Sequence, residues 1–206
     1  MEKLSTEVSK KMTVQELVDG IVELIHKGTY LPGAPVREVE LCKLFGVSRT
    51  PVREALRLLQ NSGVVEYIPR CGVQIAEMSR ETLSNITETR TVLEVLSTRQ
   101  AAQRITQEEV EELYRINECF HTSSDPKEKS GLDNLFHTRI AQISGNPCVV
   151  QFLSNLLLRQ AVVPATFEDR PQRSQFSYVE HNGILQAMEL RVPELAAKQA
   201  DIHFHM

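Results

Sequence analysis

The run Gly46-Val-Ser-Arg-Thr-Pro-Val-Arg-Glu-Ala-Leu56 constrains the fold of this 206-residue chain more than any other segment. Ser48 is suited to cap a helix, because its hydroxyl can accept a hydrogen bond from an unpartnered backbone N–H at the helix start. Pro51 fits the first turn, where its missing donor costs little. The run therefore predicts a helix that begins at Ser48 and ends at 61–63. Its buried stripe is Val52, Ala55, Leu56 and Leu59.

Short hydroxyl and long guanidinium side chains gather at the N-terminal end of this predicted helix, largely off the apolar stripe. A DNA major groove is contacted by side chains of these kinds. The helix is therefore predicted to be a recognition helix. The side chains concerned are Ser48, Arg49, Thr50 and Arg53.

The segments around the recognition helix complete a small domain. Thr13-Val-Gln-Glu16 fits a capping box at the start of a first helix, which Gly28 ends. A short helix up to Phe45 follows, and the β-prone runs 64–68 and 73–76 are joined by a turn at 69–72. Three helices and a hairpin predict a winged helix-turn-helix domain over residues 1–78.

The remaining residues, 79–206, show one helical pattern after another. Short polar, Gly- or Pro-containing breaks between them predict an all-α antiparallel helical bundle, so the fold class is mainly α. The predicted helices are Thr82–Arg104, Gln107–Phe120, Pro126–Ser144, Cys148–Val163, Ser174–Leu190 and Pro193–Phe204, with a ten-residue connection at Pro164–Arg173.

Charge is distributed unevenly between these two parts. Residues 1–78 contain ten Lys and Arg against ten Asp and Glu, whereas residues 79–206 contain 13 against 17 and carry the whole net charge of −4. DNA affinity would then need local basic clustering and dimerisation. No apolar run approaches the ~20 residues that span a bilayer, and the polar start argues against a signal peptide. We expect a cytoplasmic protein with no membrane partner.

The run 46–56, preceded by Leu31-Pro-Gly33 and followed by Asn61-Ser-Gly63 and Gly72, resembles the GntR family of bacterial transcription regulators. The helical half is similar to the FadR-type effector domain, or FCD domain, of that family. Its markers here are Arg90-x-x-Leu-Glu94, Asp133-x-x-Phe-His137, Gly145-Asn146, Glu180-His181 and His203.

The resemblance implies a homodimer whose winged domains bind a palindromic operator in double-stranded DNA, at the nucleoid. It implies DNA contacts by Arg49, Thr50, Arg53 and the wing at Arg70 and Gly72. It also implies that the bundle binds a small organic acid, and in many members a divalent metal through one Asp and three His. In this sequence Val39 stands where some members have a DNA-contacting Arg, and Cys71 interrupts the usual Arg-Gly of the wing tip, so the operator sequence does not transfer.

Asp133 and His137 are four residues apart and would share one face of a helix. His181 and His203 fall in two later predicted helices. If these helices converge, one carboxylate and three imidazoles would form a set that suits zinc, nickel, manganese or iron and excludes a thiolate-type structural zinc site. The residues alone favour ordinary core or surface histidines, and it is the resemblance that favours the metal.

Arg90 lies on an otherwise apolar helical stripe with Leu83, Ile86 and Leu93. A buried arginine must be paired. Arg90 would therefore either bind a carboxylate effector through its guanidinium fork or bond a neighbouring Glu within the bundle, and the sequence leaves both open.

The sequence thus predicts a ligand-responsive transcription regulator rather than an enzyme. One alternative is a metal-dependent enzyme that acts on a small carboxylate, because an Asp/His₃ site with an open position can activate water. Another makes the N-terminal domain a protein-interaction module. Loss of salt-sensitive DNA binding on Arg49→Ala and Arg53→Ala would exclude the second alternative.

Overall fold

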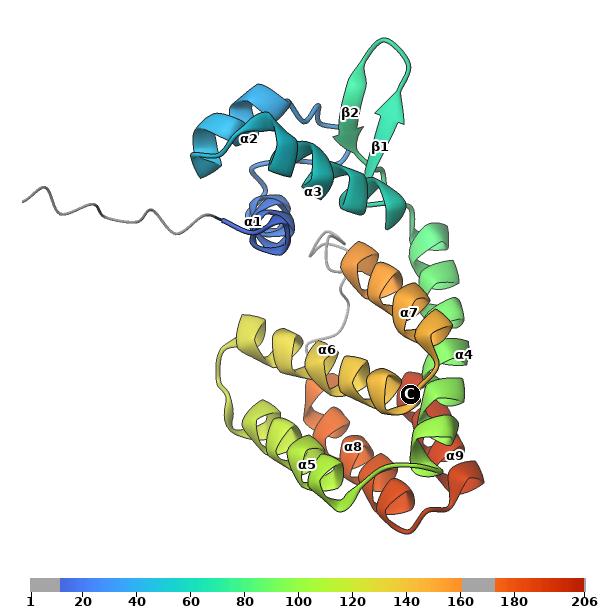
Figure 1. Cartoon of the computed structure of the whole chain (residues 1–206). Coiled ribbons are helices and arrows are strands. Elements are labelled where there is room, and N and C mark those ends of the chain that lie inside the picture. The colour runs from blue at the N-terminus through green and yellow to red at the C-terminus, as the bar shows by residue number, and fades with distance from the viewer. Residues whose placement is uncertain (1–11, 161–172, 206) are drawn as a thin grey trace, which may run out of the picture. The chain divides into compact units, whose positions relative to one another are not determined.

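The computed structural model describes residues 12–160 and 173–205. The chain divides into two compact units, residues 1–77 and 78–206, which are described separately (Figure 1). The predicted helical residues 161–163 and nearly all of the predicted 164–173 connection lie outside the described residues.

The N-terminal unit contains three helices followed by a two-stranded antiparallel hairpin, which is the predicted winged helix-turn-helix (Figure 1). Helices α1 and α2 both pack against α3. The elements are α1 (Val14–His26), α2 (Glu38–Phe45), α3 (Arg49–Asn61), β1 (Val65–Ile68) and β2 (Gly72–Ile75).

The start of α1 confirms the predicted capping box. The Thr13 hydroxyl accepts a hydrogen bond from the Glu16 N–H (3.1 Å), and the Glu16 carboxylate accepts one from the Thr13 N–H (2.7 Å). Two of the unpartnered donors at the helix start are therefore satisfied reciprocally. Leu17 and Ile21, on the apolar face that follows, are fully buried.

The start of α3 corrects one prediction. Ser48 occupies the N-cap position with an extended backbone, but its side chain makes no capping hydrogen bond. An N-cap hydroxyl bonds the N–H of the second or third helical residue, and the third residue here is Pro51, which has no N–H. Pro51 therefore removes one of the two donors that Ser48 could use. The predicted stripe of α3 is buried, with Val52, Ala55 and Leu59 fully inaccessible.

The wing is anchored to the segment between α1 and α2. Strand β1 pairs antiparallel with β2, and Pro35 forms an additional bridge to Gln74. The Val36 N–H donates to the Val73 carbonyl (2.8 Å), and the Ile75 N–H donates to the Ala34 carbonyl (2.9 Å). Strand β2 is consequently bonded along both edges, to β1 on one side and to the segment before α2 on the other.

The C-terminal unit is an all-α bundle (Figure 1). Helix α4 packs against α6, α7 and α9, while α8 lies between α5 and α9. Of the described helices, none is long and apolar enough to cross a membrane. The elements are α4 (Arg80–Ala102), α5 (Gln107–Thr122), α6 (Pro126–Ile143), α7 (Pro147–Gln160), α8 (Arg173–Glu189) and α9 (Pro193–His205).

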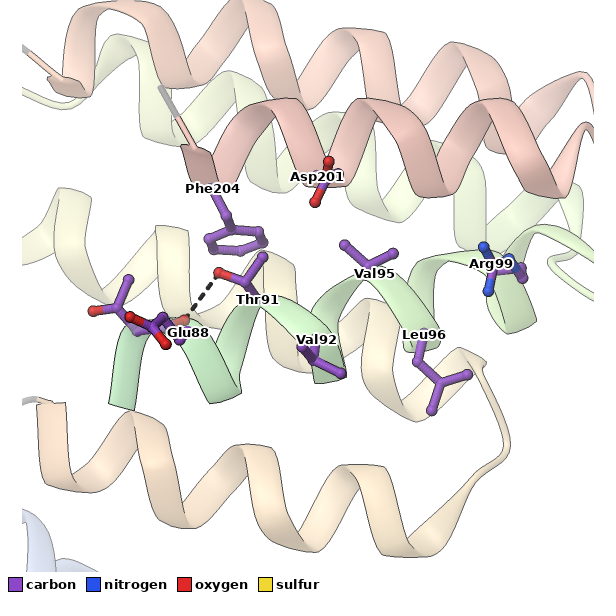
Figure 2. A pocket seen from close by; sticks show the side chains of 9 residues that line it. Glu88, Thr91, Val92, Val95, Leu96, Arg99, Asp201 and Phe204 are labelled. Carbon is purple, nitrogen blue, oxygen red and sulfur yellow. Dashed lines mark hydrogen bonds between the residues drawn. The ribbon is translucent and has the colours of Figure 1, made fainter. Parts of the chain in front are cut away.

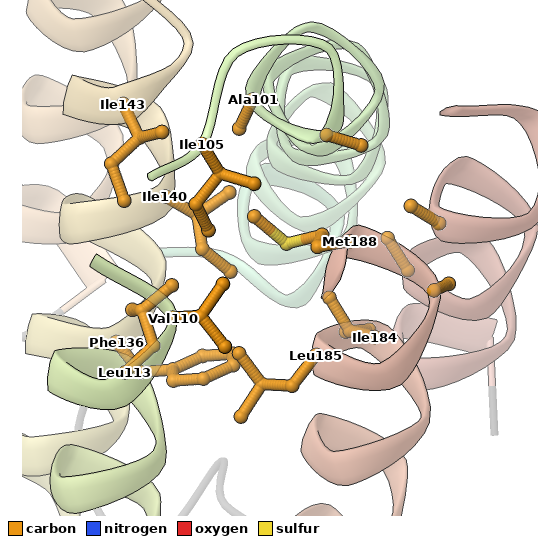
Figure 3. Close-up of a cluster of buried hydrophobic side chains, with 14 residues drawn as sticks. Ala101, Ile105, Val110, Leu113, Phe136, Ile140, Ile143, Ile184, Leu185 and Met188 are labelled. Atoms are coloured by element: carbon orange, nitrogen blue, oxygen red, sulfur yellow. The ribbon is translucent and has the colours of Figure 1, made fainter. Parts of the chain in front are cut away.

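One large apolar cluster joins α4, α5, α6, α8 and α9 (Figure 3). Leu113, Ile140 and Leu185 are completely inaccessible at its centre. Phe136 lies in the same cluster, one residue before His137. The core therefore fixes the helices from which the polar side chains of the site project.

Candidate functional site

The exposed face of α3 presents the side chains that the sequence predicts for DNA contact. Ser48, Arg49, Thr50 and Arg53 are all exposed and lie off the buried stripe. A helix that buries one face and presents guanidinium and hydroxyl groups at its N-terminal end has the form of a major-groove recognition helix.

Arg53 makes a contact that the sequence analysis missed. Its Nε donates to both carboxylate oxygens of Glu38, on α2, at 2.9 Å each. The Arg53 side chain nevertheless remains 62% exposed. Glu38 thus fixes the base of the guanidinium and leaves the Nη groups available to an acceptor on DNA.

We expect Glu38→Gln to lower DNA specificity while raising non-specific affinity, because it removes a negative charge and releases Arg53. The ratio of specific to non-specific affinity should fall by about two- to fivefold, the size of an exposed ion-pair effect. Fluorescence anisotropy with operator and scrambled duplexes measures this ratio. Glu54→Gln, at an exposed position on α3, is the matched control. An unchanged ratio in Glu38→Gln would show that the pair does not orient Arg53.

The wing tip is a tight turn with two residues of positive φ, Arg70 (+70°) and Gly72 (+90°). The Cys71 N–H donates to the Ile68 carbonyl (3.1 Å) and closes the turn. Arg70 is exposed at this tip, where the resemblance predicts a DNA contact. Val39 on α2 is also 48% exposed, so an apolar side chain lies on the surface where some members of the family carry an arginine.

Four predicted metal ligands meet in the C-terminal unit. Asp133 and His137 project from α6, His181 from α8 and His203 from α9, and one ligand atom of each lies within 4.8 Å of all the others. The three imidazoles are almost fully buried, at 2%, 0% and 3% exposure, whereas the Asp133 side chain is 28% exposed. The three helices therefore converge, as the predicted metal site requires, and Asp133 lies on the solvent side of the cluster.

A side-chain oxygen lies beside the Nδ1 atom of each histidine. His137 Nδ1 lies 3.3 Å from Glu94 Oε2, His181 Nδ1 lies 2.9 Å from Asn117 Oδ1, and His203 Nδ1 lies 2.6 Å from Glu180 Oε2. The Asn117 amide is itself oriented, because its Nδ2 donates to the Tyr178 carbonyl and to Asn182 Oδ1. Partners of this kind place the proton on Nδ1 and leave a lone pair on Nε2.

The Nε2 atoms meet at the centre of the cluster. His137 Nε2 and His203 Nε2 are 3.2 Å apart, and His181 Nε2 lies 3.5 Å from Asp133 Oδ1. With the protons on Nδ1, the Nε2 lone pairs face one another, an arrangement that a cation between them stabilises. Ligands that bind one ion at 2.0–2.1 Å would be separated by roughly 3 Å. The donor set and its spacing therefore fit a first-row transition metal ion and offer no thiolate.

Aromatic packing holds all three imidazoles in place. The Phe136 ring stacks on His181 with centroids 4.1 Å apart. The Phe204 ring lies 5.1 Å from the His137 ring and 4.7 Å from the His203 ring. The ligands consequently lie in a rigid, mostly dry environment.

Arg90 is buried and bonded within the bundle, as one of the two sequence alternatives predicts. Its Nε donates to Glu94 Oε1 (3.1 Å) and its Nη1 donates to Gln160 Oε1 (3.0 Å). Its Nη2 is buried without a hydrogen-bond partner among the described residues. Arg90 is thus separated by a single carboxylate, that of Glu94, from the ligand His137.

Glu94 is almost completely buried between these two groups. Burial alone would raise the pKa of its carboxyl, but the neighbouring His137 and Arg90 outweigh that effect and hold the pKa below its ordinary value. Glu94 is therefore an anion that both orients a ligand and neutralises Arg90.

Three orienting residues were not predicted from the sequence. Glu94 and Glu180 appear there only as parts of family markers. Glu180 is adjacent to His181 in the sequence, but its carboxylate contacts His203. Asn117 had a usable signal, because it is polar and shares one helical stripe with the buried Leu113 and Phe120.

Two family profiles match most of the chain. The profile described as bacterial regulatory proteins of the gntR family matches residues 13–75, and that of the FCD domain matches residues 85–206, more than half of the chain. The first covers α1 to β2 and the second covers most of α4 and all helices after it.

Curated relatives align over nearly the whole length. The chain is 26% identical to the HTH-type transcriptional regulator YdhC of Bacillus subtilis over 190 residues, which is 89% of this chain and 84% of the relative. It is 27% identical to the Glc operon transcriptional activator of Escherichia coli (91% and 84%), and 26% identical to a probable D-xylose utilization operon transcriptional repressor of Paenarthrobacter nicotinovorans (95% and 87%).

Solved structures share the fold. Escherichia coli McbR/YncC superposes with a TM-score of 0.78 at 20% identity, covering 93% of this chain and 92% of that one. A GntR regulator from Rhodococcus gives a TM-score of 0.71 at 19% identity, covering 93% of each chain. The matched families and relatives are transcriptional regulators, so the enzyme alternative is not supported. The chain belongs to the GntR family of bacterial regulatory proteins and is a DNA-binding, ligand-responsive transcriptional regulator with a C-terminal FCD domain.

Proposed function

We propose that this regulator binds a palindromic operator as a homodimer and that a small organic acid, bound at a metal centre in the C-terminal unit, controls operator affinity. Residues 1–78 would form the DNA-binding domain and residues 79–206 the effector-binding and dimerisation domain. The observation that carries the proposal is the cluster of three imidazoles, each anchored at Nδ1 and each with Nε2 directed to one point beside Asp133. The DNA target implies a cytoplasmic location, at the nucleoid when the operator is bound.

Asp133, His137, His181 and His203 would hold the ion. Their three nitrogens and one oxygen suit zinc, nickel, manganese or iron. The ion would act as a Lewis acid toward an oxygen ligand. Four protein ligands leave a further position on an ion that accepts five or six, and Asp133 is the ligand that faces solvent. A carboxylate effector could approach from that side.

Arg90 would supply the second contact to the effector. Its buried Nη2 has no hydrogen-bond partner within the described residues, and an unsatisfied buried guanidinium donor costs free energy. A carboxylate is the acceptor that a guanidinium fork prefers. Because Glu94 joins Arg90 to His137, effector and metal would act on one connected set of side chains.

The DNA contacts would come from Arg49, Thr50 and Arg53 of α3, with Ser48 at the helix start, and from Arg70 and Gly72 of the wing. An effector changes operator affinity only if it binds the DNA-competent and DNA-incompetent states unequally. A coupling free energy of about 1–3 kcal/mol changes affinity roughly 5- to 150-fold.

Footprinting and metal analysis of the purified, untagged full chain test this function. We expect protection of a short palindrome near the regulator's own or a neighbouring gene, and about one first-row metal ion per chain. Absence of any sequence-specific footprint would overturn operator binding, and metal-free protein after growth in metal-rich medium would overturn the metal centre.

We expect Arg90→Lys to weaken effector binding more than it weakens folding, because lysine keeps a positive charge beside the buried Glu94 and lacks the guanidinium fork. A panel of small organic acids, screened by thermal shift on metal-loaded wild type, first supplies a ligand through mass-action stabilisation. Its dissociation constant should then rise by about 10-fold or more in Arg90→Lys, the cost of one charge-assisted hydrogen bond. Isothermal titration and chemical denaturation give the two values. A larger loss in unfolding free energy than in binding free energy would make Arg90 a purely structural residue.

A further inference from the structure

The outer face of α4 carries an apolar row that the described chain covers only in part. Val92 is 67% exposed, whereas Val95 and Leu96, which lie beside it along a groove of about 540 Å³ between α4 and α9, are partly buried. This face is opposite the buried side of α4 that carries Arg90 and Glu94. An exposed apolar row on a helix of a compact bundle marks a surface that binds a partner.

A charged residue lies at each end of this row, and the two charges are of opposite sign. Figure 2 shows Glu88 at one end and Arg99 at the other, with Val92, Val95 and Leu96 between them. Arg99 contacts Glu194 on α9 at 3.1 Å, yet 40% of its side chain remains exposed. Arg99 can therefore meet a second carboxylate.

The spacing of the row is symmetric about its centre. The face consists of positions 88, 91, 92, 95, 96 and 99. These positions form pairs, 88 with 99, 91 with 96 and 92 with 95, and the two members of each pair are equally far from a point between 93 and 94. When two such helices pack antiparallel about a two-fold axis at that point, Glu88 lies opposite Arg99 of the other copy. Val92 lies opposite Val95, and Leu96 lies opposite Thr91, a largely buried residue at the edge of the face. The face is thus complementary to itself in spacing and in charge, as an isologous contact requires.

We propose that α4 packs antiparallel on α4 of a second copy of this chain, with Val92 and Val95 at the centre and a Glu88–Arg99 ion pair at each end. The inference rests on the homodimer of the proposed function and gives that dimer an interface. The surface is also joined to the metal centre, because Phe204 lines the groove and contacts the rings of His137 and His203.

Sedimentation equilibrium of the full chain over a concentration series tests the contact. Val92→Glu should raise the dimer dissociation constant at least ~30-fold, the loss typical of a residue at an interface centre. Val179→Glu is the matched control, because Val179 on α8 is also 67% exposed and lies away from the row. It should leave the constant unchanged.

Charge reversal tests the two-fold symmetry directly. Glu88→Arg places two arginines opposite each other at both ends and should weaken the dimer about tenfold or more. Adding Arg99→Glu to Glu88→Arg restores opposite charges at both ends and should recover the wild-type constant within ~threefold. Glu194→Gln removes the intrachain partner of Arg99 and should not weaken the dimer.

The outcomes separate this inference from the function on which it rests. A wild-type dimer that is unaffected by both Val92→Glu and Glu88→Arg would overturn the α4 contact and leave the operator-binding dimer intact. Failure of the double reversal to restore a dimer that Glu88→Arg weakens would overturn the antiparallel register. A wild-type chain that stays monomeric at ~100 µM would overturn the homodimer itself and assign the groove to another occupant.

Discussion

Replacing His181 with alanine is expected to abolish metal binding by the C-terminal unit. His181 is completely buried, and its Nε2 lies 3.5 Å from Asp133 Oδ1 at the centre of the cluster. Loss of a residue that merely orients a ligand typically costs 10- to 100-fold in metal affinity, so loss of the ligand itself should exceed about 100-fold. Metal analysis after dialysis against a competing chelator measures this loss. The metal-dependent rise in melting temperature should disappear with it.

Two further variants make this result interpretable. His121→Ala changes an exposed histidine that stacks on Tyr178, and it should retain full metal content. Asp133→Asn keeps the shape of a partly exposed ligand, so it tests the site in a variant that should fold normally. Full metal content in both His181→Ala and Asp133→Asn would show that the ion binds elsewhere.

Arg49→Ala is expected to abolish sequence-specific DNA binding. A bidentate arginine–base contact contributes about 1–3 kcal/mol of discrimination. A dimer on a palindrome loses the contact in both half-sites, for a total of about 2–6 kcal/mol. That corresponds to a loss of roughly 30-fold to more than 10⁴-fold in affinity. Fluorescence anisotropy on the footprinted operator, repeated over a salt series, gives both the loss and its charge dependence.

Arg115→Ala is the matched control for this substitution. Arg115 is an exposed arginine on α5, in the C-terminal unit, so its removal changes net charge equally without touching α3. Equal losses in the two variants would mean that the effect is bulk electrostatics and that Arg49 makes no specific contact.

Local patterns predicted the elements of this fold well. The capping box at Thr13 and the apolar stripe from Val52 to Leu59 depend on residues within one helix, and the structure confirms both. The missing Ser48 bond was also decided locally, by Pro51 three residues later. Whether Ser48 can form a capping hydrogen bond therefore depends on Ser48 and Pro51 together.

The sequence identified the candidate metal ligands but not the contacts that bring them together. The i, i+4 spacing places Asp133 and His137 on one face, but their meeting with His203 depends on how α6 and α9 pack across 66 residues of sequence. The partners of the imidazoles depend on the same packing, since Asn117 and His181 are 64 residues apart. The pairing of Arg53 with Glu38 likewise follows from the docking of α2 on α3. No single-helix pattern specifies these contacts.

The position of His203 near the end of α9 has a consequence for local order. Terminal helical turns open readily, because few contacts hold them. Here the last turns carry His203, which is buried against Glu180 and His137, and then Phe204, which borders the outer face of α4. An ion bound by His203 would suppress fraying of the last turns of α9. Slower amide hydrogen exchange in these turns would then show that the buried site holds a metal ion.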